Sequence, residues 1–265
     1  MPISIIGRQS ELGKLLARHA GASPDLKLLV NLAGQQANTL LHDGHAWKDF
    51  DKTLKAGVRR SLRTDADFIV FASFAFVQRI PPKDPLRSLA ETILACEQEV
   101  LAEPVPACVV RLGYLYGPTS QDLHAYRKAF RLGRPYWAGP RTAGQFHLHH
   151  DDAVRALLLA ANPRHAGKTF YATAGGAVPF MRFMDYFARG IGKRCPLHIP
   201  LLAAPVMQLI VRKEHMQQVA LAMPSGPPRP QVPRWKPKLA DYRRGIDSLL
   251  ADWQAASGAP GSGTP

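Results

Sequence analysis

Continuous apolar runs alternate with segments of helical periodicity along the first part of the chain. The apolar runs, typical of buried strands, are residues 3–6, 26–34, 67–77 and 107–118. The segments with apolar positions at helical spacing are residues 11–20, 46–63 and 85–102. Strands that are apolar on both faces indicate a parallel sheet covered by helices on both sides. The pattern therefore predicts an α/β fold with a doubly wound, Rossmann-like parallel sheet.

Beyond residue 118 the elements are shorter and more varied. Helices are expected at residues 124–133, 151–161 and 178–192, and strands at 146–150 and 169–173. The segment 223–238 is too rich in proline for regular structure. The predicted organisation is a Rossmann-like core at 1–170 (with 118–145 partly in a second lobe), a small C-terminal lobe of substrate-binding type at 171–252, and a disordered tail at 253–265.

Composition permits a large core but gives the chain an unusual charge. Hydrophobic residues make up 46% of the 265 positions, which excludes global disorder, and lysine plus arginine number 34 against 20 acidic residues, a formal charge of +14. Such a balance favours an acidic protein partner or a membrane-associated complex, although a basic surface that follows from an arginine-rich composition explains it equally well. No basic motif with interleaved aromatic residues is present, so nucleic acid is the least supported partner.

Cysteine usage and hydropathy bear on the cellular compartment. The three cysteines have no CxxC or other metal-binding spacing, and their odd number argues against a disulfide framework. The first residues do not resemble a signal peptide, and the longest apolar stretch, 199–211, is too short to span a bilayer. We therefore expect a cytoplasmic protein, with a peripheral position on a membrane face as the alternative.

Four segments, in the order of the chain, resemble motifs of one enzyme family. They are VNLAG (30–34), VVRLGYLYGP (109–118), HHDDAVRALLLA (149–160) and RWKPKLADYRRGIDSLLADW (234–253). They are similar to the VNLAA, RLxNVYGP, HVDDVARA and GWxPxxxxxEGL segments of the extended short-chain dehydrogenase/reductase family, which includes NAD-dependent epimerases and dehydratases. The resemblance implies a Rossmann fold and a site for NAD or NADP.

The resemblance also implies where catalytic residues should stand. Members use a tyrosine, a lysine four residues later and a serine or threonine. The pair Glu97-Gln98 resembles the family's EQ, which places the lysine position at Ile93 and the tyrosine position at Leu89. Neither side chain can move a proton. The strand at 67–77 resembles VFVSSAAVYG, which places Phe74 at the serine position and Ser73 one residue earlier, on the opposite face.

The cofactor end departs from the family as well. The loop GRQSELG (7–13) resembles GxxGxxG with Ser10 in place of the middle glycine, where a side chain would crowd a pyrophosphate. Only 24 positions separate Gly7 from Asn31, about half the family's spacing, so the strand that carries the ribose-binding residue is missing. In a second alignment residues 3–7 correspond to the family's third strand instead. The candidate cofactor residues are Gly7, Ser10, Gly13, Asn31, Ala33 and Gly34.

Three functions compete on these observations. The first is a diverged member that is not a working oxidoreductase, binds either no cofactor or NAD(P), and acts as a binding or accessory subunit. The second is a non-redox enzyme (an isomerase, cyclase or lyase) that reuses the pocket. The third is an active NAD(P)-dependent epimerase or reductase.

Candidate site residues follow from these three functions. The catalytic candidates are Tyr114, Tyr116 and Ser73, and the non-redox enzyme adds His149 and Asp151, because ligands bind at the carboxyl ends of such strands. Three histidines, His147, His149 and His150, precede two aspartates that we expect to cap the next helix. That arrangement resembles the family's, which holds no metal there, so we predict no metal site. The family often dimerises through the helix at 85–102, so a homodimer is a further expectation.

Overall fold

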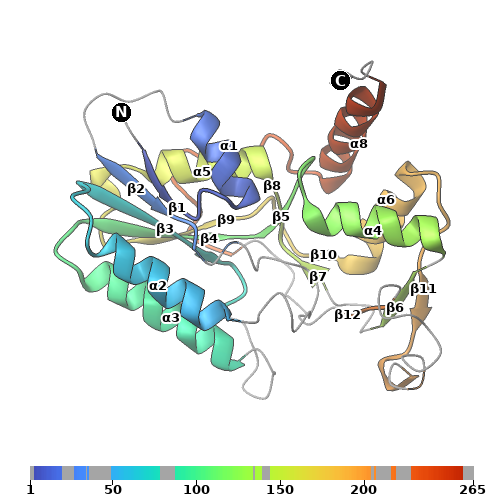
Figure 1. Cartoon of the computed structure of the whole chain (residues 1–265), viewed down its shortest axis with the longest axis horizontal. Coiled ribbons are helices and arrows are strands. Elements are labelled where there is room, and N and C mark those ends of the chain that lie inside the picture. The colour runs from blue at the N-terminus through green and yellow to red at the C-terminus, as the bar shows by residue number, and fades with distance from the viewer. Residues whose placement is uncertain are drawn as a thin grey trace, which may run out of the picture.

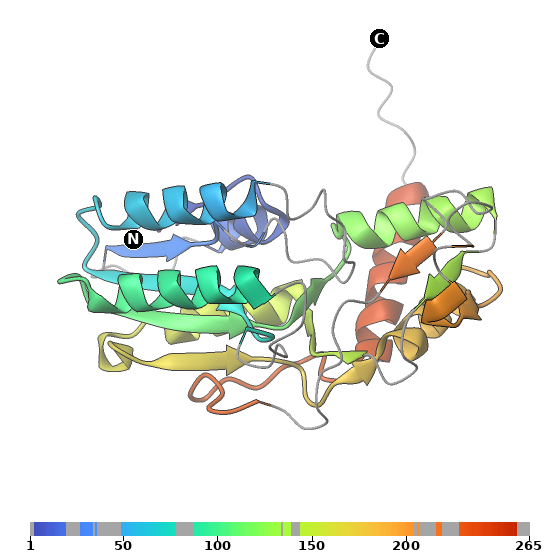
Figure 2. The same cartoon turned by 90° about the horizontal axis from the view of Figure 1, so that it is seen from below.

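The computed structural model describes residues 3–19, 27–33, 35, 49–77, 87–133, 135–138, 144–203, 206, 216–218 and 228–258. In Figure 1 and Figure 2 they form a core built on one sheet and a smaller lobe beside the carboxyl ends of the core strands. The core sheet has five parallel strands in the order β1-β2-β3-β4-β9. These strands are β1 (Ser4–Ile6), β2 (Leu28–Asn31), β3 (Phe68–Phe74), β4 (Ala107–Leu112) and β9 (Thr169–Ala172).

Helices cover both faces of this sheet. One face carries α1 (Glu11–Arg18) and α5 (His150–Ala160), and the other carries α2 (Phe50–Ser61) and α3 (Arg87–Ala102) (Figure 1). Each face has its own apolar layer, since buried side chains of α1 and α5 pack on one side of the strands and those of α2 and α3 on the other. The predicted Rossmann-like α/β fold is confirmed.

The first strand occupies a position that decides between the two alignments of the N-terminal segment. In the standard order 3-2-1-4-5-6, strand 1 borders strand 4, whereas strand 3 lies at the outer end. Here β1 pairs directly with β2, the strand of the VNLAG motif. This is the position of a first strand, so the loop 7–13 stands where the glycine-rich loop belongs. Among the described residues no strand lies outside β1.

The step from β1 to β2 also has an unusual hand. The crossovers through α1, α2 and α3 all step in the same direction along the sheet, yet α1 lies on the face opposite to α2 and α3. The crossover through α1 therefore has the opposite hand to the other two, and about 98% of such crossovers share one hand. In the standard order, the helix after strand 1 leads to strands 2 and 3 at the outer end of the sheet before the chain crosses to strand 4. If strands 2 and 3 were absent, that helix would connect strand 1 to strand 4 on this face, as α1 connects β1 to β2 here.

The strand predicted over 107–118 is in fact two strands. It breaks at Gly113, where a Cβ would lie 2.4 Å from the backbone oxygen of Phe146. After the break, β5 (Tyr114–Tyr116) leaves the core sheet and pairs with β8 (His147–His149). The apolar run hid this break because the residues on both sides of the glycine are buried.

In the described part of the lobe, helices α4, α6 and α8 combine with short strands. Its elements are α4 (Gln121–Leu132), α6 (Phe180–Gly190), α8 (Tyr242–Gly258), β6 (Tyr136–Ala138), β7 (Gly144–Gln145), β10 (Val178–Pro179), β11 (Leu197–Ile199) and β12 (Met216–Gln218). The helices share a third apolar cluster, in which Phe183 and Phe187 of α6 meet Ile246 and Leu249 of α8. No helix within the described part of the chain is long and apolar enough to cross a membrane.

The disordered tail predicted at 253–265 begins too early. Helix α8 continues to Gly258, and Trp253 is only 7% exposed. Its indole Nε1 donates to the oxygen of Pro118 at 2.7 Å, and His124 stacks on the ring with 4.4 Å between centroids. The aromatic anchor thus keeps the end of the helix against the lobe, while residues 259–265 lie outside the described part of the chain.

Candidate functional site

The loop after β1 keeps two features of a phosphate-binding turn and changes the third. Gly7 has φ of +82°, and a Cβ at Gly13 would lie 2.4 Å from the oxygen of Gly7, so both positions require glycine. Between them Ser10 caps α1, since its hydroxyl accepts from Gly13 N–H at 3.0 Å and donates to Gly7 O at 2.7 Å. The serine therefore occupies a helix N–H that a bound phosphate would otherwise use.

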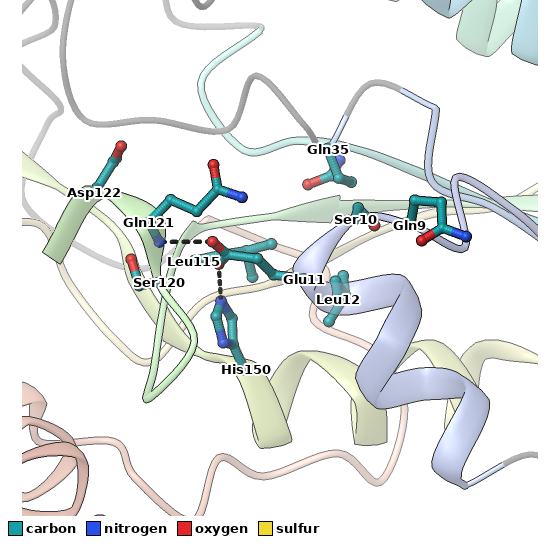
Figure 3. A pocket seen from close by; sticks show the side chains of 10 residues that line it. All are labelled: Gln9, Ser10, Glu11, Leu12, Gln35, Leu115, Ser120, Gln121, Asp122 and His150. Atoms are coloured by element: carbon teal, nitrogen blue, oxygen red, sulfur yellow. Dashed lines mark hydrogen bonds and ion pairs between the residues drawn. The ribbon is translucent and has the colours of Figure 1, made fainter. Parts of the chain in front are cut away.

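Glu11, the first residue of α1, points away from the helix toward the lobe. Its Oε1 accepts from the backbone N–H of Gln121 at 2.6 Å, and its Oε2 lies 3.4 Å from Nε2 of His150 (Figure 3). Burial raises the pKa of this carboxyl from 4.5 to about 7. His150 is itself buried, and burial lowers its pKa to about 3, so its ring is neutral at pH 7.

A cavity of about 440 Å³ opens beside this carboxyl. It lies where α1, β5 and the start of α4 meet, at the carboxyl ends of the core strands (Figure 3). The side chains that line it are those of Gln9, Ser10, Glu11, Leu12, Gln35, Leu115, Ser120, Gln121, Asp122 and His150. The described lining therefore contains two carboxyl groups and neither lysine nor arginine.

The predicted cofactor residues on β2 serve the packing of α2 instead of the cavity. Asn31 is fully buried, its Oδ1 accepts from Ala33 N–H at 3.0 Å, and its Nδ2 donates to Ser61 Oγ at 3.3 Å. A Cβ on Gly57 of α2 would lie 2.2 Å from the Cβ of Ala33. Gly34 lies outside the described residues.

Ser73 belongs to a buried polar network. Its hydroxyl donates to the Glu97 carboxylate, which also accepts from Arg111 Nε at 2.9 Å and Nη2 at 2.5 Å. Arg111 Nη1 in turn donates to the hydroxyl of Tyr171 at 2.9 Å. Ser73, Glu97 and Arg111 are no more than 5% exposed. The network ties β3, α3, β4 and β9 together, and Ser73 does not line the cavity.

The family's proton-handling helix corresponds to α3, between β3 and β4. Ile93 is fully buried, and Leu89 is partly buried against the same apolar cluster, so both side chains serve the core. Phe74 is buried as well, against Phe50 and Phe76. The first tyrosine of the whole chain is Tyr114, so no shift of alignment can give α3 a tyrosine.

Tyr114 and Tyr116 lie on β5 and face the lobe. Tyr114 donates to Asp122 Oδ2 at 3.2 Å, and burial raises its pKa well above 10. The hydroxyl of Tyr116 is buried against Gly245 of α8 without a hydrogen-bond partner among the described residues, and burial raises its pKa too. Of these two tyrosines, Tyr114 contacts a residue that lines the cavity, because its hydroxyl donates to Asp122.

The histidine–aspartate segment is structural in most of its contacts. His149, rather than an aspartate, caps α5 by accepting from Asp151 N–H at 3.3 Å. Asp152 is 1% exposed and accepts from the backbone N–H groups of Lys238 and Leu239, both at 2.8 Å. Asp151 is 68% exposed. Within the described ranges, no group of three or more histidine, cysteine or acidic side chains is arranged to hold a metal ion.

Sequence reasoning missed most of the cavity. It did not single out Glu11, Gln35, Gln121 or Asp122, and it considered His150 only as a metal ligand. Acidic residues in the first turn of a helix are common because they complement its dipole, so Glu11 and Asp122 gave no distinguishing signal. The one available hint was that Glu11 directly follows the serine that replaces the middle glycine.

The charge of the cavity is opposite to what a dinucleotide pyrophosphate requires. A phosphate group is stabilised by free N–H groups at a helix N-terminus or by cationic side chains. Here Ser10 accepts from the N–H of Gly13, Glu11 accepts from that of Gln121, and no cationic side chain in the described part of the chain lines the cavity. The residues present do not fit a pyrophosphate at this position.

No protein-family model matches the chain, and no curated protein is similar to it in sequence. Solved structures are similar in fold. RMD from Pseudomonas aeruginosa, complexed with NADPH, has a TM-score of 0.68 at 16% identity, and the match covers 96% of this chain and 99% of that one. A human epimerase family protein with NADPH has a TM-score of 0.68 at 14% identity over 95% and 100% of the two chains.

A UDP-glucuronic acid 4-epimerase variant from Bacillus cereus, in complex with NAD, gives a TM-score of 0.68 at 11% identity over 97% and 100% of the two chains. These likenesses extend over nearly the whole of each chain, and so include both the core with its parallel sheet and the lobe. The chain therefore has the fold of the extended short-chain dehydrogenases/reductases.

Proposed function

We propose that this chain is a diverged, epimerase/dehydratase-like member of that family which does not transfer hydride and works as a binding or accessory subunit. The observation that carries the proposal is Glu11. Its carboxyl group takes the helix N-terminus of α4 and lines the cavity where the fold places a dinucleotide. A pyrophosphate there would have to displace this carboxyl or share the space with it.

Two further observations support the loss of redox chemistry. Helix α3 contains neither tyrosine nor lysine, so it offers no phenol whose pKa a neighbouring ammonium lowers. The first strand β1 has no outer neighbour within the described chain, so the strand that carries a ribose-binding residue in this fold has no counterpart there. The three losses affect the proton donor, the pyrophosphate and the adenosine ribose separately.

The accessory role is suggested by charge. With a formal charge of +14, the chain is suited to an acidic protein partner or a membrane-associated assembly on the cytoplasmic side. Salt dependence would identify this kind of association, because surface electrostatics weaken as the ionic strength rises.

Calorimetric titration of the purified chain with NAD, NADH, NADP and NADPH tests the proposal. We expect no binding tighter than about 1 mM, which corresponds to about 4 kcal/mol. The double variant Ser10→Gly with Glu11→Gln removes the capping hydroxyl and the carboxylate, and should bind NADPH more tightly than the unmodified chain. Low-micromolar binding by the unmodified chain, together with hydride transfer to any carbonyl substrate, would show that the proposal is wrong.

A non-redox enzyme is the second candidate, and the pKa of Glu11 favours it. A carboxyl with a pKa near 7 is suited to exchange protons at neutral pH, and it lines a cavity large enough for a small molecule. Tyr116, His149 and Asp151, which the sequence suggested for this role, do not line the cavity. Turnover of a substrate that Glu11→Gln abolishes, and that the Tyr116→Phe variant retains, would favour the enzyme over the accessory subunit.

A further inference from the structure

The cavity beside Glu11 lies where open parallel sheets bind their ligands. It adjoins the turn after β1 and the end of β5, at the carboxyl ends of the core strands (Figure 3). Its volume of about 440 Å³ falls within the range of small-molecule sites. Position and size therefore point to a ligand independently of the chemistry of the lining.

The lining is acidic in a basic protein. The chain holds 34 lysines and arginines, but none of those among the described residues lines this cavity, whereas Glu11 and Asp122 do. The other polar groups in the described lining are amides, serine hydroxyls and the neutral ring of His150, and that ring is the one aromatic side chain among these residues. These groups can accept hydrogen bonds from a cation, and the described lining contains no cationic side chain that would compensate the charge of an anion.

Among the described residues, no lysine or arginine contacts the carboxyl group of Glu11. Its contacts are the N–H of Gln121 on α4 and the neutral His150 on α5. Two charged groups in the described chain lie near enough to affect the pKa of this carboxyl. Asp122 on α4 raises the pKa, and Lys14 on α1 lowers it by less than the hydrogen bond from Gln121 does. Lys14 itself is exposed. The Glu11 side chain is 26% exposed, so desolvation of its carboxylate is partial, and no cationic side chain among the described residues offsets it.

We propose that this cavity binds a small primary amine in its protonated form, with the Glu11 carboxylate as its counter-ion and Asp122 and the amide oxygens as further acceptors. The proposal rests on the proposed function, because a pyrophosphate and an ammonium group cannot use the same lining. An ammonium group has three N–H donors, and the lining supplies several oxygen acceptors. A quaternary ammonium is disfavoured, since such cations are held by aromatic cages. A divalent metal is disfavoured, since no ligating group of three occurs in the described chain.

Binding should release a proton. The amine favours ionised Glu11, so a carboxyl that is about half protonated at pH 7 loses its proton when the amine enters. If the amine restores the ordinary pKa of 4.5, its affinity at pH 8 exceeds that at pH 5 by up to roughly 70-fold.

Calorimetry in an amine-free buffer tests this with ethanolamine and putrescine as probes, tetramethylammonium as a cation without N–H donors, and inorganic pyrophosphate and NADH as anions. Proton release is followed with a pH indicator in weakly buffered solution. We expect the primary amines to bind most tightly, with release of about half a proton at pH 7. Glu11→Gln should lower their affinity at least tenfold and abolish the release. Glu99→Gln, an exposed position on α3 with the same change of charge, should leave both unchanged.

Each other outcome has a definite meaning. If neither primary amine binds, or if Glu11→Gln does not weaken them, this inference is wrong while the proposed function stands. Equal binding of tetramethylammonium contradicts the hydrogen-bonded primary amine. If NADH binds with low-micromolar affinity and more tightly than the amines, both this inference and the proposed function fail.

Discussion

Replacing Glu11 by glutamine removes an ionisable group whose pKa differs strongly between the folded and unfolded chain. In the folded protein burial raises this pKa to about 7, and in the unfolded chain it is 4.5. Between these values the folded state holds a proton that the unfolded state has lost. The contribution of Glu11 to stability is therefore present below pH 4.5 and is lost as the pH rises to 7. The difference in pKa corresponds to about 3 kcal/mol at high pH.

The glutamine variant cannot ionise, so it avoids this loss. It should be more stable than the unmodified chain by roughly 3 kcal/mol at pH 8 and by only about 1 kcal/mol at pH 5. The change of about 2 kcal/mol between the two conditions amounts to a relative shift of the thermal midpoint by roughly 4–8 °C. Buried neutral histidines destabilise the folded state as the pH falls below 6.5, but they are common to both proteins.

Thermal and urea unfolding at several values between pH 5 and pH 8 measure this difference directly. Glu99→Gln serves as the control, and its difference from the unmodified chain should not vary with pH. A Glu11→Gln variant that is less stable than the unmodified chain at pH 8, or whose difference stays constant across the range, would refute the partly buried carboxylate without a cationic partner on which the argument rests.

Three further changes test the packing around the site. Gly245→Ala should lower the free energy of unfolding by about 1–3 kcal/mol, since its Cβ would lie 2.0 Å from the Tyr116 hydroxyl. The decrease should be smaller in a Tyr116→Phe background, and urea unfolding midpoints measure both values. Glu97→Gln should lower the free energy of unfolding by about 3–5 kcal/mol, because the buried guanidinium of Arg111 then has no carboxylate partner. Glu91→Gln breaks only an exposed ion pair and should lower it by under about 1 kcal/mol in the same urea unfolding measurement. Asp152→Ala should lower the free energy of unfolding by about 2–4 kcal/mol, because it removes the acceptors for two backbone N–H groups. Amide hydrogen exchange at residues 238–239 should accelerate, and unchanged exchange would contradict this role of Asp152.

Most of the core was predictable because its signal is local. The strands of the core sheet are largely apolar on both faces, and the helices between them repeat their apolar residues at helical spacing. The type of each element and the order of the elements along the chain can therefore be inferred from the sequence. The break at Gly113 was not predictable from this pattern. It depends on the close approach of a residue far along the chain, Phe146, which leaves no trace in the hydropathy of the strand. The end of α8 likewise depends on contacts of Trp253 with Pro118.

The site was predictable only where the backbone conformation or a close backbone contact requires one particular residue type. Gly7 and Gly13 reveal the turn because no other residue fits their conformation and spacing. Ser73 and Asn31, in contrast, were singled out by resemblance, and the structure places both in contacts with side chains of helices α3 and α2. The role of Glu11 is set by its distance from Gln121, which is 110 positions away in sequence, so no local pattern carries it.

The proposed function attributes the loss of cofactor binding and the loss of catalysis to separate physical causes, and the two can be tested apart. The absence of tyrosine from α3 would remove proton transfer but leave dinucleotide affinity intact. The outer position of β1 and the carboxyl of Glu11 would instead lower affinity, one by removing the ribose contact and the other by repelling the pyrophosphate. A chain altered only at the dyad should still bind NADPH tightly. If this chain proves to bind amines and not NADPH, and if its Glu11→Gln variant is more stable but no longer binds amines, then Glu11 lowers stability at the position where it serves a ligand. That combination is the signature of a binding residue rather than of a structural one.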